Sequence, residues 1–312
     1  MATVERPRTD WIDLPPAIHE FVAEILDARV TSAISQMNGF SPGSADRVSG
    51  ANGGRAFVKA VHRDRNPGAF DLHRREIDVM TVLPPTVSAP ALLGSYDRDG
   101  WVALILDDID GRHPGHDGDG SETWAVLDAF ATFPRIDRST QGRLPRVFDD
   151  IATEARGWRE IADDGAANLL PEWAQSRLAQ LRDAADAAPK AADGEHLQHL
   201  DSRADNVLID VTQKAWIIDW PWASVGARWV DGLMYLFDCR VRDEAVDSDT
   251  ILRTHPLFEG VDASAIDSVL SAVTGGFFNK ARQPSPPNMP ALREFQRKEG
   301  IAGAAWLRER WE

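Results

Sequence analysis

Three oxygen-bearing side chains stand at a spacing that suits phosphoryl transfer. Asp201 is followed five residues later by Asn206, and Asp219 comes after a short hairpin pattern, each beside an apolar, β-rich run. Transfer to an alcohol requires a carboxylate that receives the hydroxyl proton and oxygen ligands that hold Mg²⁺ on the nucleotide phosphates. We therefore expect Asp201 to be the base, and Asn206 and Asp219 to be the metal ligands. Taken singly, each residue is more typical of a turn, a strand entry or a cap.

Residues 199–206 and residues 217–220 together form a catalytic motif. The first segment reads H-x-D-x-x-x-x-N and the second reads Ile-Ile-Asp-Trp. Protein kinases use H-R-D-x-x-x-x-N followed by D-F-G for the same work. The variant found here resembles the aminoglycoside phosphotransferase family of small-molecule kinases. The resemblance follows the motif order along nearly the whole chain, and it is most specific over residues 196–235.

The resemblance implies roles for further residues near the motif. His199 is expected to hold the catalytic loop by hydrogen bonds and not to act as the base. Arg203 stands where protein kinases have a lysine that contacts the γ-phosphate, although an arginine that faces solvent or pairs with Asp205 is an equally good interpretation. Leu200 departs from the family, in which a small residue, often glycine, is common. Asp231 matches an acidic position that braces the loop or lies near the substrate, and a helix N-cap is the simpler explanation.

Lys59 lies within an otherwise apolar strand, residues 57–61. An inward-pointing lysine there needs a compensating anion, because an isolated buried charge is costly. In kinases the α- and β-phosphates of the nucleotide supply that anion, and a helix carboxylate holds the lysine in place. Glu76 is the best candidate for this carboxylate, and Asp71 and Asp78 are weaker ones. A surface lysine on an edge strand is the alternative, which the downstream motif makes less favourable.

Residues 39–46 are rich in turn-forming residues and are expected to cover the nucleotide phosphates. The glycines, Gly43 among them, permit a close backbone approach, and the hydroxyls of Ser41 and Ser44 are suited to donate to phosphate oxygens. The segment contains neither G-x-G-x-x-G nor the Walker pattern, so the assignment depends on its position ahead of Lys59. The resembling family has a similarly loosened loop.

Residues 104–111 resemble the segment that joins the two lobes in that family. The resemblance implies that backbone groups around Leu106 and Asp108 bind the purine. Because backbone groups make this contact, the side chains there do not distinguish ATP from GTP.

The order of predicted elements changes character near residue 107. A sheet-rich pattern with one crossing helix precedes this point, and long helical patterns follow it. The 312 residues are enough for two lobes. We therefore expect an α+β, two-lobed protein-kinase-like fold, with an N-terminal nucleotide-binding lobe at 1–107 and a mostly helical catalytic and substrate-binding lobe at 108–312.

Hydrophobic periodicity and turn signals place the individual elements. Residues 35–48 are expected to be rich in turns, Trp220 to lie in the core, and Pro189 to stop a helix. Strands are predicted at 55–61, 91–96 and 101–106, and a hairpin at 206–218. Helices are predicted at 123–133, 147–162, 171–188, 230–240, 263–273 and 291–311.

The composition narrows the possible partners and compartment. A net charge of −15 argues against nucleic acid or an anionic membrane as a general partner, and it is compatible with a cationic substrate. The longest apolar run, residues 101–106, is too short to span a bilayer, and the N-terminus lacks a signal-peptide core. The single cysteine, Cys239, excludes an internal disulfide, fits a reducing cytoplasm and is expected to be a buried structural thiol.

These features predict a Mg²⁺- and ATP- or GTP-dependent O-phosphotransferase that acts on a hydroxylated small molecule. An antibiotic is the first expectation, because a phosphate blocks a hydroxyl and adds negative charge. The alternatives are a metabolic kinase for choline, homoserine or a sugar, and a catalytically silent nucleotide-binding relative. A protein kinase is disfavoured, because D-F-G and A-P-E are missing and only eleven residues separate Asp219 from Asp231. The oligomeric state stays open.

Overall fold

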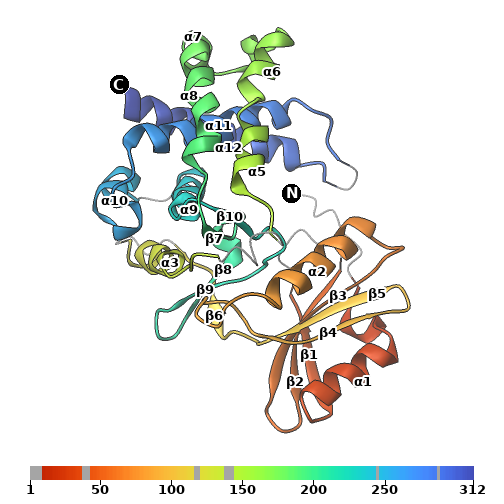
Figure 1. Ribbon diagram of the computed structural model, residues 1–312. Coiled ribbons are helices and arrows are strands. Elements are labelled where there is room, and N and C mark those ends of the chain that lie inside the picture. Colours follow the sequence, from red (N-terminus) through yellow and green to blue (C-terminus); the bar gives the residue numbers. More distant parts are fainter. Residues whose placement is uncertain (1–8, 37–42, 116–119, 137–143, 244–245, 287–288) are drawn as a thin grey trace. The chain divides into compact units, whose positions relative to one another are not determined.

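The computed structural model describes residues 9–36, 43–115, 120–136, 144–243, 246–286 and 289–312 (Figure 1). The chain divides into two compact units. Unit 1 consists of Met1–His113 and Asp205–Trp222, and unit 2 consists of Pro114–Ala204 and Ala223–Glu312. Residues 205–222 belong to unit 1 because their first strand pairs with residues 111–112. The lobes expected at 1–107 and 108–312 are defined by nucleotide binding and by catalysis with substrate binding, and they stay a prediction.

Unit 1 is built on a five-stranded antiparallel sheet with the strand order β1-β2-β3-β5-β4. Two of the predicted strands, at 55–61 and 101–106, are present almost to the residue. The Asn52-Gly53 turn connects β2 to β3, and Gly53 has the positive φ of 85° that such a turn requires. The strands are β1 (Val30–Ser35), β2 (Ser44–Gly50), β3 (Arg55–His62), β4 (Leu92–Arg98) and β5 (Trp101–Leu106).

The expectation of a turn-rich stretch at 35–48 is wrong for residues 44–48, which form most of β2. Polar residues alternate there with buried ones, and Ser44 and Asp46 are buried on the same side as Val48. Pairing with β3 along its whole length fixes this segment as a strand despite its polar composition. Residues 37–42, which precede it, lie outside the described part of the chain.

Two helices cover opposite faces of this sheet. Helix α1 (Pro16–Ile25), which follows the 3₁₀ turn η1 (Trp11–Asp13), packs its buried face on Val58 and Ala60 of β3. Helix α2 (Pro67–Met80) packs on Val61 and Val102. Because side chains alternate along a strand, Lys59 shares the α2 face with Val61. The β-strand period therefore directs Lys59 toward α2.

A second, three-stranded sheet in unit 1 contains the predicted hairpin. Strand β6 (Gly111–Arg112) pairs with β8 (Val207–Asp210), which pairs with β9 (Ala215–Ile217). Asp210 closes the hairpin turn, because its carboxylate accepts hydrogen bonds from the backbone of Thr212 and Lys214 at 2.8 and 3.1 Å. The short 3₁₀ turn η3 (Ala204–Asn206) leads into β8. The hairpin thus begins directly after Asn206 and ends two residues before Asp219.

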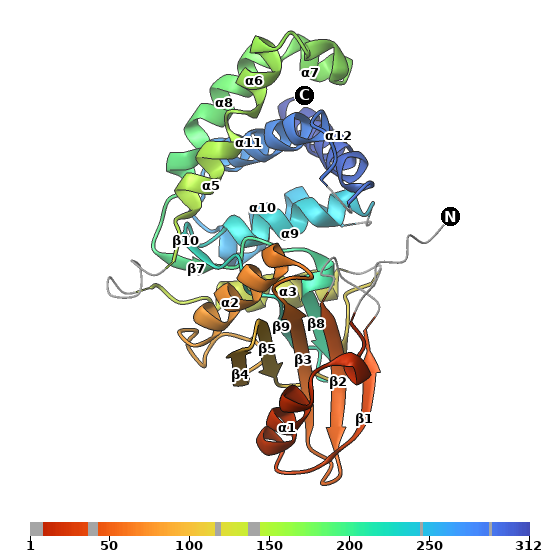
Figure 2. The ribbon, with the colours of Figure 1, turned by 90° about the vertical axis from the view of Figure 1, so that its right-hand side faces the viewer.

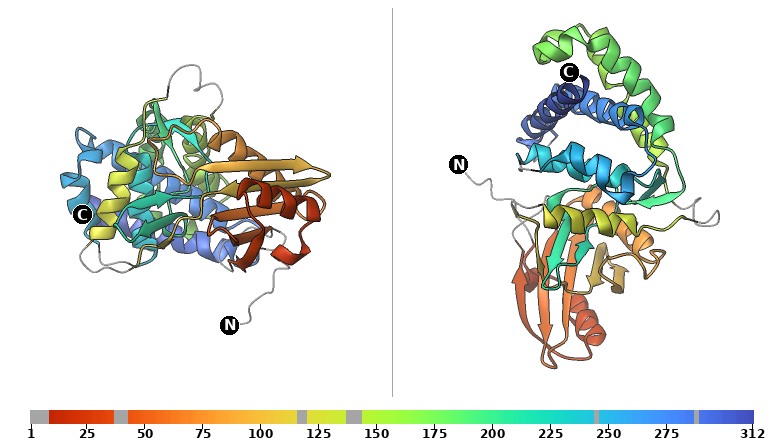
Figure 3. Two further views of the ribbon diagram at one scale, coloured as in Figure 1. Left: turned by 90° about the horizontal axis from the view of Figure 1, so that it is seen from below. Right: turned by 90° about the vertical axis from the view of Figure 1, so that its left-hand side faces the viewer.

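Unit 2 is mostly helical, as expected for the second half of the chain. Helix α11 packs against α5, α6, α8 and α12 (Figure 2). Figure 3 shows the same helices from two further directions. A two-stranded sheet of β7 (His196–Gln198) and β10 (Ser224–Gly226) lies at the base of this unit. The helices are α3 (Ser121–Ala131), α5 (Val147–Glu154), α6 (Gly157–Asp163), α7 (Glu172–Ser176), α8 (Leu178–Ala191), α9 (Val230–Val241), α10 (Ser248–Thr254), α11 (Ala263–Ala281) and α12 (Leu292–Trp311), with 3₁₀ turns η2 (Ala167–Leu169) and η4 (Pro256–Phe258).

The helix predictions at 147–162 and at 171–188 need correction, and the second is split into α7 and α8 at Arg177. The helix expected at 147–162 is split into α5 and α6, since Gly157 is a poor helix former and packs directly on the backbone of Gly275. The expected stop at Pro189 is also wrong, because α8 continues to Ala191. The proline sits in the last turn, where packing of Leu181 and neighbouring alanines outweighs the one lost hydrogen bond.

Two expectations about buried residues are confirmed. Trp220 is fully buried, and its indole N–H donates to the carbonyl of Ile217 at 2.9 Å. Cys239 is fully buried in α9, and burial raises the pKa of its thiol to about 12. Within the described ranges, no helix is long and apolar enough to cross a membrane.

The contact between α6 and α11 gives a test of the packing in unit 2. A Cβ atom at Gly157 would lie 2.3 Å from the carbonyl oxygen of Gly275, which belongs to the backbone and cannot rotate away. We expect Gly157→Ala to lower the free energy of unfolding by about 1–3 kcal/mol through overpacking. Gly115→Ala is the control, because a Cβ there meets no atom within 4 Å. Thermal unfolding of both variants measures the difference, and equal Tm values would contradict this packing.

Candidate active site

Lys59 is held by two carboxylates within unit 1. Its ammonium lies 2.9 Å from Oε1 of Glu76 and 3.0 Å from Oδ1 of Asp219. The backbone N–H of Trp220 also donates to Glu76 Oε1 at 3.3 Å. The structure therefore brings together three of the residues predicted from the sequence, and they come from β3, α2 and the segment after β9.

Local structure explains why Glu76 reaches Lys59. Helix α2 begins with Pro67, and the side chain of Asn66 caps it by accepting a hydrogen bond from the N–H of Ala69 at 2.9 Å. Glu76 lies on the buried face of α2, and the face of β3 that carries Lys59 packs against this helix. The weaker candidates Asp71 and Asp78 are exposed on the same helix. The strand period of Lys59 in β3 and the helix period of Glu76 in α2 turn the two side chains toward each other and so explain the ion pair.

The two carboxylates keep Lys59 charged. Burial by itself lowers the pKa of the ammonium, but the charges of Asp219 and Glu76 outweigh burial and raise the pKa above its ordinary value. His73, one turn before Glu76, responds in the opposite direction. Burial and the charge of Lys59 lower the pKa of His73 to about 3, so this imidazole is neutral at physiological pH. Its Nε2 atom has no hydrogen-bond partner in the described part of the chain.

The β8–β9 hairpin places Asn206 and Asp219 at the same end of a sheet. Val207 pairs with Ile217, and the N–H of Ile218 donates to the carbonyl oxygen of Asn206 at 2.9 Å. Asp219 has a φ of 67°, a left-handed conformation that aspartate tolerates better than most residues. An amide oxygen and a carboxylate are hard ligands that fit Mg²⁺. Asp219 also remains 46% exposed while it pairs with Lys59, which leaves its carboxylate accessible to a cation.

The loop that carries Asp201 is organised within unit 2 by Asp231. The buried carboxylate of Asp231 accepts hydrogen bonds from the N–H of His199 at 2.5 Å, the N–H of Leu200 at 2.9 Å and the hydroxyl of Ser202 at 2.7 Å. Burial raises the pKa of Asp231, whereas the nearby His199 and these donors act in the opposite direction. Asp231 therefore braces the loop, one of the interpretations of the sequence, whereas the N-cap interpretation is wrong because α9 begins at Val230 with Trp229 at its N-cap.

The other residues of the loop take definite positions. Arg203 Nε lies 3.4 Å from Oδ1 of Asp201, so this arginine pairs with the predicted base. The ring nitrogen Nδ1 of His199 accepts a hydrogen bond from the N–H of Asp201 at 3.3 Å, and His199 is fully buried. Leu200 has a φ of 62°, which explains why glycine would suit this position. The catalytic roles of these residues stay predictions.

The phosphate-covering loop is only partly described. Ser41 lies outside the described residues. Gly43 packs closely on β3, since a Cβ there would lie 2.7 Å from the carbonyl oxygen of Ala60. Ser44 pairs with Ala60 and is buried on the α1 face of the sheet, whereas Lys59 faces α2. The structure therefore does not bring the Ser44 hydroxyl together with Lys59.

The segment after β5 is held by arginines that the sequence analysis did not single out. Asp108 Oδ1 lies 2.6 Å from Arg47 Nε, and Asp108 Oδ2 lies 2.6 Å from Arg55 Nη2. Arg47 also donates to the carbonyl oxygen of Ile109. The side chain of Asp108 therefore holds this backbone segment in place. The predicted contact of the Leu106 and Asp108 backbone groups with the purine stays a prediction. The register of the β2–β3 hairpin, in which Arg47 pairs with Phe57 and Ser49 with Arg55, brings the two arginines together, and the sequence offered no signal for it.

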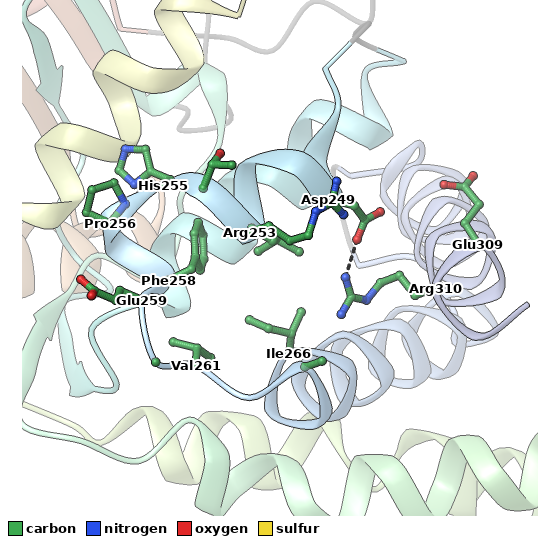
Figure 4. Close-up of a pocket in the computed structure, with 14 residues that line it drawn as sticks. Asp249, Arg253, His255, Pro256, Phe258, Glu259, Val261, Ile266, Glu309 and Arg310 are labelled. Carbon is green, nitrogen blue, oxygen red and sulfur yellow. Dashed lines mark hydrogen bonds and ion pairs between the residues drawn. The ribbon is translucent and has the colours of Figure 1, made fainter.

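A separate groove lies in unit 2 among α10, η4, α11 and α12 (Figure 4). Arg310 crosses it, forming ion pairs with Asp249 and Asp267. The indole N–H of Trp306 also donates to Asp249 at 3.1 Å. Its lining contains no residue that the sequence analysis assigned to catalysis, nucleotide or metal. These side chains join α12 to α10 and α11, so their contacts stabilise the packing of the helices around the groove.

Comparison with known proteins identifies related sequences and folds. The sequence model of the phosphotransferase enzyme family matches residues 39–263. No curated protein matches the chain. An aminoglycoside phosphotransferase from Alicyclobacillus acidocaldarius subsp. acidocaldarius DSM 446 is 14% identical with a TM-score of 0.58, over 95% of this chain and 96% of that one.

Two further solved structures are similar. A spectinomycin phosphotransferase in complex with ADP and spectinomycin is 11% identical with a TM-score of 0.59, over 94% of this chain and 98% of that one. A choline kinase from Streptococcus pneumoniae is 14% identical with a TM-score of 0.54, over 93% and 98%. These likenesses confirm the α+β, protein-kinase-like fold.

The bracing of the catalytic loop by Asp231 is testable. Asp231→Asn keeps the size of the side chain but loses one acceptor oxygen and points an NH₂ group at a backbone N–H. We expect it to lower the free energy of unfolding by about 2 kcal/mol, because a buried donor is left unsatisfied. Thermal unfolding and proteolysis near residue 200 report the effect. Asp183→Asn, whose side chain is 69% exposed, is the control, and a Tm equal to that of the control would contradict the bracing role.

Proposed function

Because the chain belongs to the phosphotransferase enzyme family, we propose that it transfers the γ-phosphoryl group of Mg-ATP or Mg-GTP to a hydroxyl group of a small molecule. Family membership confirms the resemblance of the motifs and the expectation of an enzyme that transfers phosphoryl groups. The observation that best supports the nucleotide-binding part of the proposal is the Lys59–Glu76 ion pair at 2.9 Å. A lysine ordered by a helix carboxylate is the arrangement that kinases use for the α- and β-phosphates.

The reaction assigns one task to each residue. Asp201 orients the substrate hydroxyl and takes its proton as the oxygen forms a bond to the γ-phosphorus. The bond from the γ-phosphorus to the bridging oxygen breaks, and its electron pair leaves with the nucleoside diphosphate. Arg203 supplies positive charge to the transferred group. Asn206 and Asp219 would hold Mg²⁺, which would neutralise the phosphate charge.

Lys59 has a second implication for nucleotide binding. Asp219 is paired with Lys59 at 3.0 Å. Both partners find better counter-charges when Mg-nucleotide binds: the lysine meets phosphates, and the carboxylate meets the cation. The ion pair therefore orients both groups at the proposed nucleotide site, where bound Mg-nucleotide would supply their counter-charges. Glu76, which is only 2% exposed and also receives the Trp220 N–H, stays as the fixed anchor.

An antibiotic is the substrate class that we place first. Among proteins of similar fold are a spectinomycin phosphotransferase and an amicoumacin kinase, the latter 11% identical with a TM-score of 0.54. Metabolic substrates are the alternative, since a choline kinase and a putative fructosamine-3-kinase from Haemophilus somnus 129PT also have this fold. The net charge of −15 favours a substrate that carries amino groups. A silent binding protein has no chemical need for Lys59, Asp201, Asn206 and Asp219 together.

The central test is a search for a phosphorylated product. Pooled hydroxylated antibiotics and amine-bearing metabolites are incubated with Mg-ATP or Mg-GTP and analysed by mass spectrometry. We expect one compound to gain a single phosphate, and we expect Asp201→Asn to lower the rate at least about 100-fold while nucleotide still binds, because only proton transfer and orientation are lost. Wild-type turnover that survives in Asp201→Asn would contradict the role of this residue. Absence of nucleotide binding by the wild type would contradict the proposed function itself.

A second test addresses Glu76. Glu76→Gln removes the charge that anchors Lys59, and we expect the Kd for Mg-ATP to rise about tenfold, which corresponds to one charge-assisted hydrogen bond of about 1.5 kcal/mol. Asp78→Asn on the exposed side of the same helix is the matched control. Isothermal titration calorimetry measures both. An unchanged Kd in Glu76→Gln would show that the anchor does not serve nucleotide binding.

A further inference from the structure

Helix α2 contacts the segment after β9 through two consecutive residues. Glu76 accepts a hydrogen bond from the backbone N–H of Trp220 at 3.3 Å. The guanidinium carbon of Arg75 lies 5.2 Å from the ring centroid of Trp222, a distance typical of a cation–π contact. All four residues belong to unit 1, so both contacts lie within one compact part of the chain.

The segment that receives these contacts has a restricted backbone. It reads Asp219-Trp-Pro-Trp222, and Asp219 has a left-handed φ of 67°. The ring of Pro221 fixes its own φ at about −65° and also restricts the residue before it. Few backbone rotations between Trp222 and Asp219 can therefore absorb a displacement of the Trp222 side chain.

The two tryptophans of this segment differ in burial. Trp220 is fully buried, whereas Trp222 is 44% exposed. Packing in the core therefore explains the position of Trp220 but only part of the position of Trp222. The contact with Arg75 gives this exposed ring a partner on the helix that carries Glu76.

We propose that Arg75 and Trp222 are positioning residues that hold α2 against the segment after β9. Their contact keeps Glu76 aligned with Lys59. The proposal rests on the proposed function, because Lys59 is expected to bind the α- and β-phosphates of the nucleotide. Glu76 lies on α2 and Asp219 begins the contacted segment, so both ion pairs of Lys59 depend on how these two parts are held together. Without the cation–π contact, α2 separates from the segment more readily and Lys59 is less well ordered.

Hydrogen exchange of the Trp220 backbone amide measures this alignment without nucleotide. The amide donates to Glu76, so it exchanges faster when α2 separates from the segment. The exchange is followed by NMR in uniformly ¹⁵N-labelled protein. We expect Trp222→Leu and Arg75→Met each to accelerate it about threefold, which is the effect of losing one partly exposed cation–π contact.

Three comparisons separate positioning from a general loss of stability. Trp222→Phe keeps an aromatic face for the guanidinium and should keep the Trp220 amide close to its wild-type rate. Arg74→Met is the matched control, because this neighbouring arginine of α2 pairs with Asp97 of β4 at 2.8 Å. The backbone amides of β3 should exchange at the wild-type rate in every variant. Equal acceleration at Trp220 and in β3, or unchanged exchange at Trp220, would overturn the inference.

The consequence for nucleotide binding is measured as the Kd for Mg-ATP by isothermal titration calorimetry. We expect Trp222→Leu and Arg75→Met each to raise the Kd about threefold, and Arg74→Met to leave it unchanged. In a protein that already carries Glu76→Gln, Trp222→Leu should have no further effect, because the contact acts through Glu76. An unchanged Kd in Trp222→Leu alone, or a further threefold rise in the double variant, would overturn the inference.

The two measurements separate this inference from the proposed function. If exchange at Trp220 responds as expected but the wild type binds no nucleotide, the proposed function fails and the positioning of α2 stands. If Mg-ATP binds to the wild type but exchange at Trp220 is the same in all variants, only the inference fails.

Discussion

The ammonium group of Lys59, which is largely shielded from solvent, joins three segments of unit 1. Lys59 sits on the inner face of β3, where a charge without partners would be too costly to retain. Glu76 and Asp219 remove that cost from two directions, and in doing so they tie α2 and the segment after β9 to the sheet. The same pair of contacts fixes the lysine where phosphates are expected. The proposed nucleotide site therefore uses the same three side chains that join these segments.

Unit 2 contains a buried carboxylate, that of Asp231. Asp231 is fully buried, and its carboxylate accepts hydrogen bonds from the backbone N–H groups of the loop that it organises. Those N–H groups converge because Leu200 adopts a left-handed φ of 62°, a conformation that costs about 1–2 kcal/mol for a residue other than glycine. The hydrogen bonds to Asp231 offset this strain. A strained backbone next to Asp201 is thus maintained by a carboxylate at the start of α9.

The sequence predicts those parts of the site that depend on local periodicity. The alternation of β3 and the helical face of α2 are enough to pair Lys59 with Glu76 rather than with Asp71 or Asp78. The hairpin pattern likewise brings Asn206 and Asp219 to one end of a sheet. These predictions succeed because each depends on the side-chain period of one helix or strand and on a short loop between neighbouring elements.

Other parts of the site depend on strand register and tertiary packing, which the sequence alone does not reveal. Ser44 was predicted beside the phosphates from its hydroxyl and its neighbourhood, but the register with β3 directs its side chain toward α1. The engagement of Asp108 by Arg47 and Arg55 also follows from register. The continuation of α8 past Pro189 reflects packing, because the helix propensity of proline predicts an end there.

Asp231 and Glu299 show how burial can produce different outcomes for the same functional group. Both are carboxyl groups within unit 2, and burial raises the pKa of each. Asp231 receives three hydrogen-bond donors, which favour its charged form and make it a rigid anchor. Glu299 receives none from the described residues, and burial raises the pKa of its carboxyl group to about 8. The number of donors supplied by the surrounding backbone therefore decides whether a buried carboxyl group is a fixed support or a titrating one.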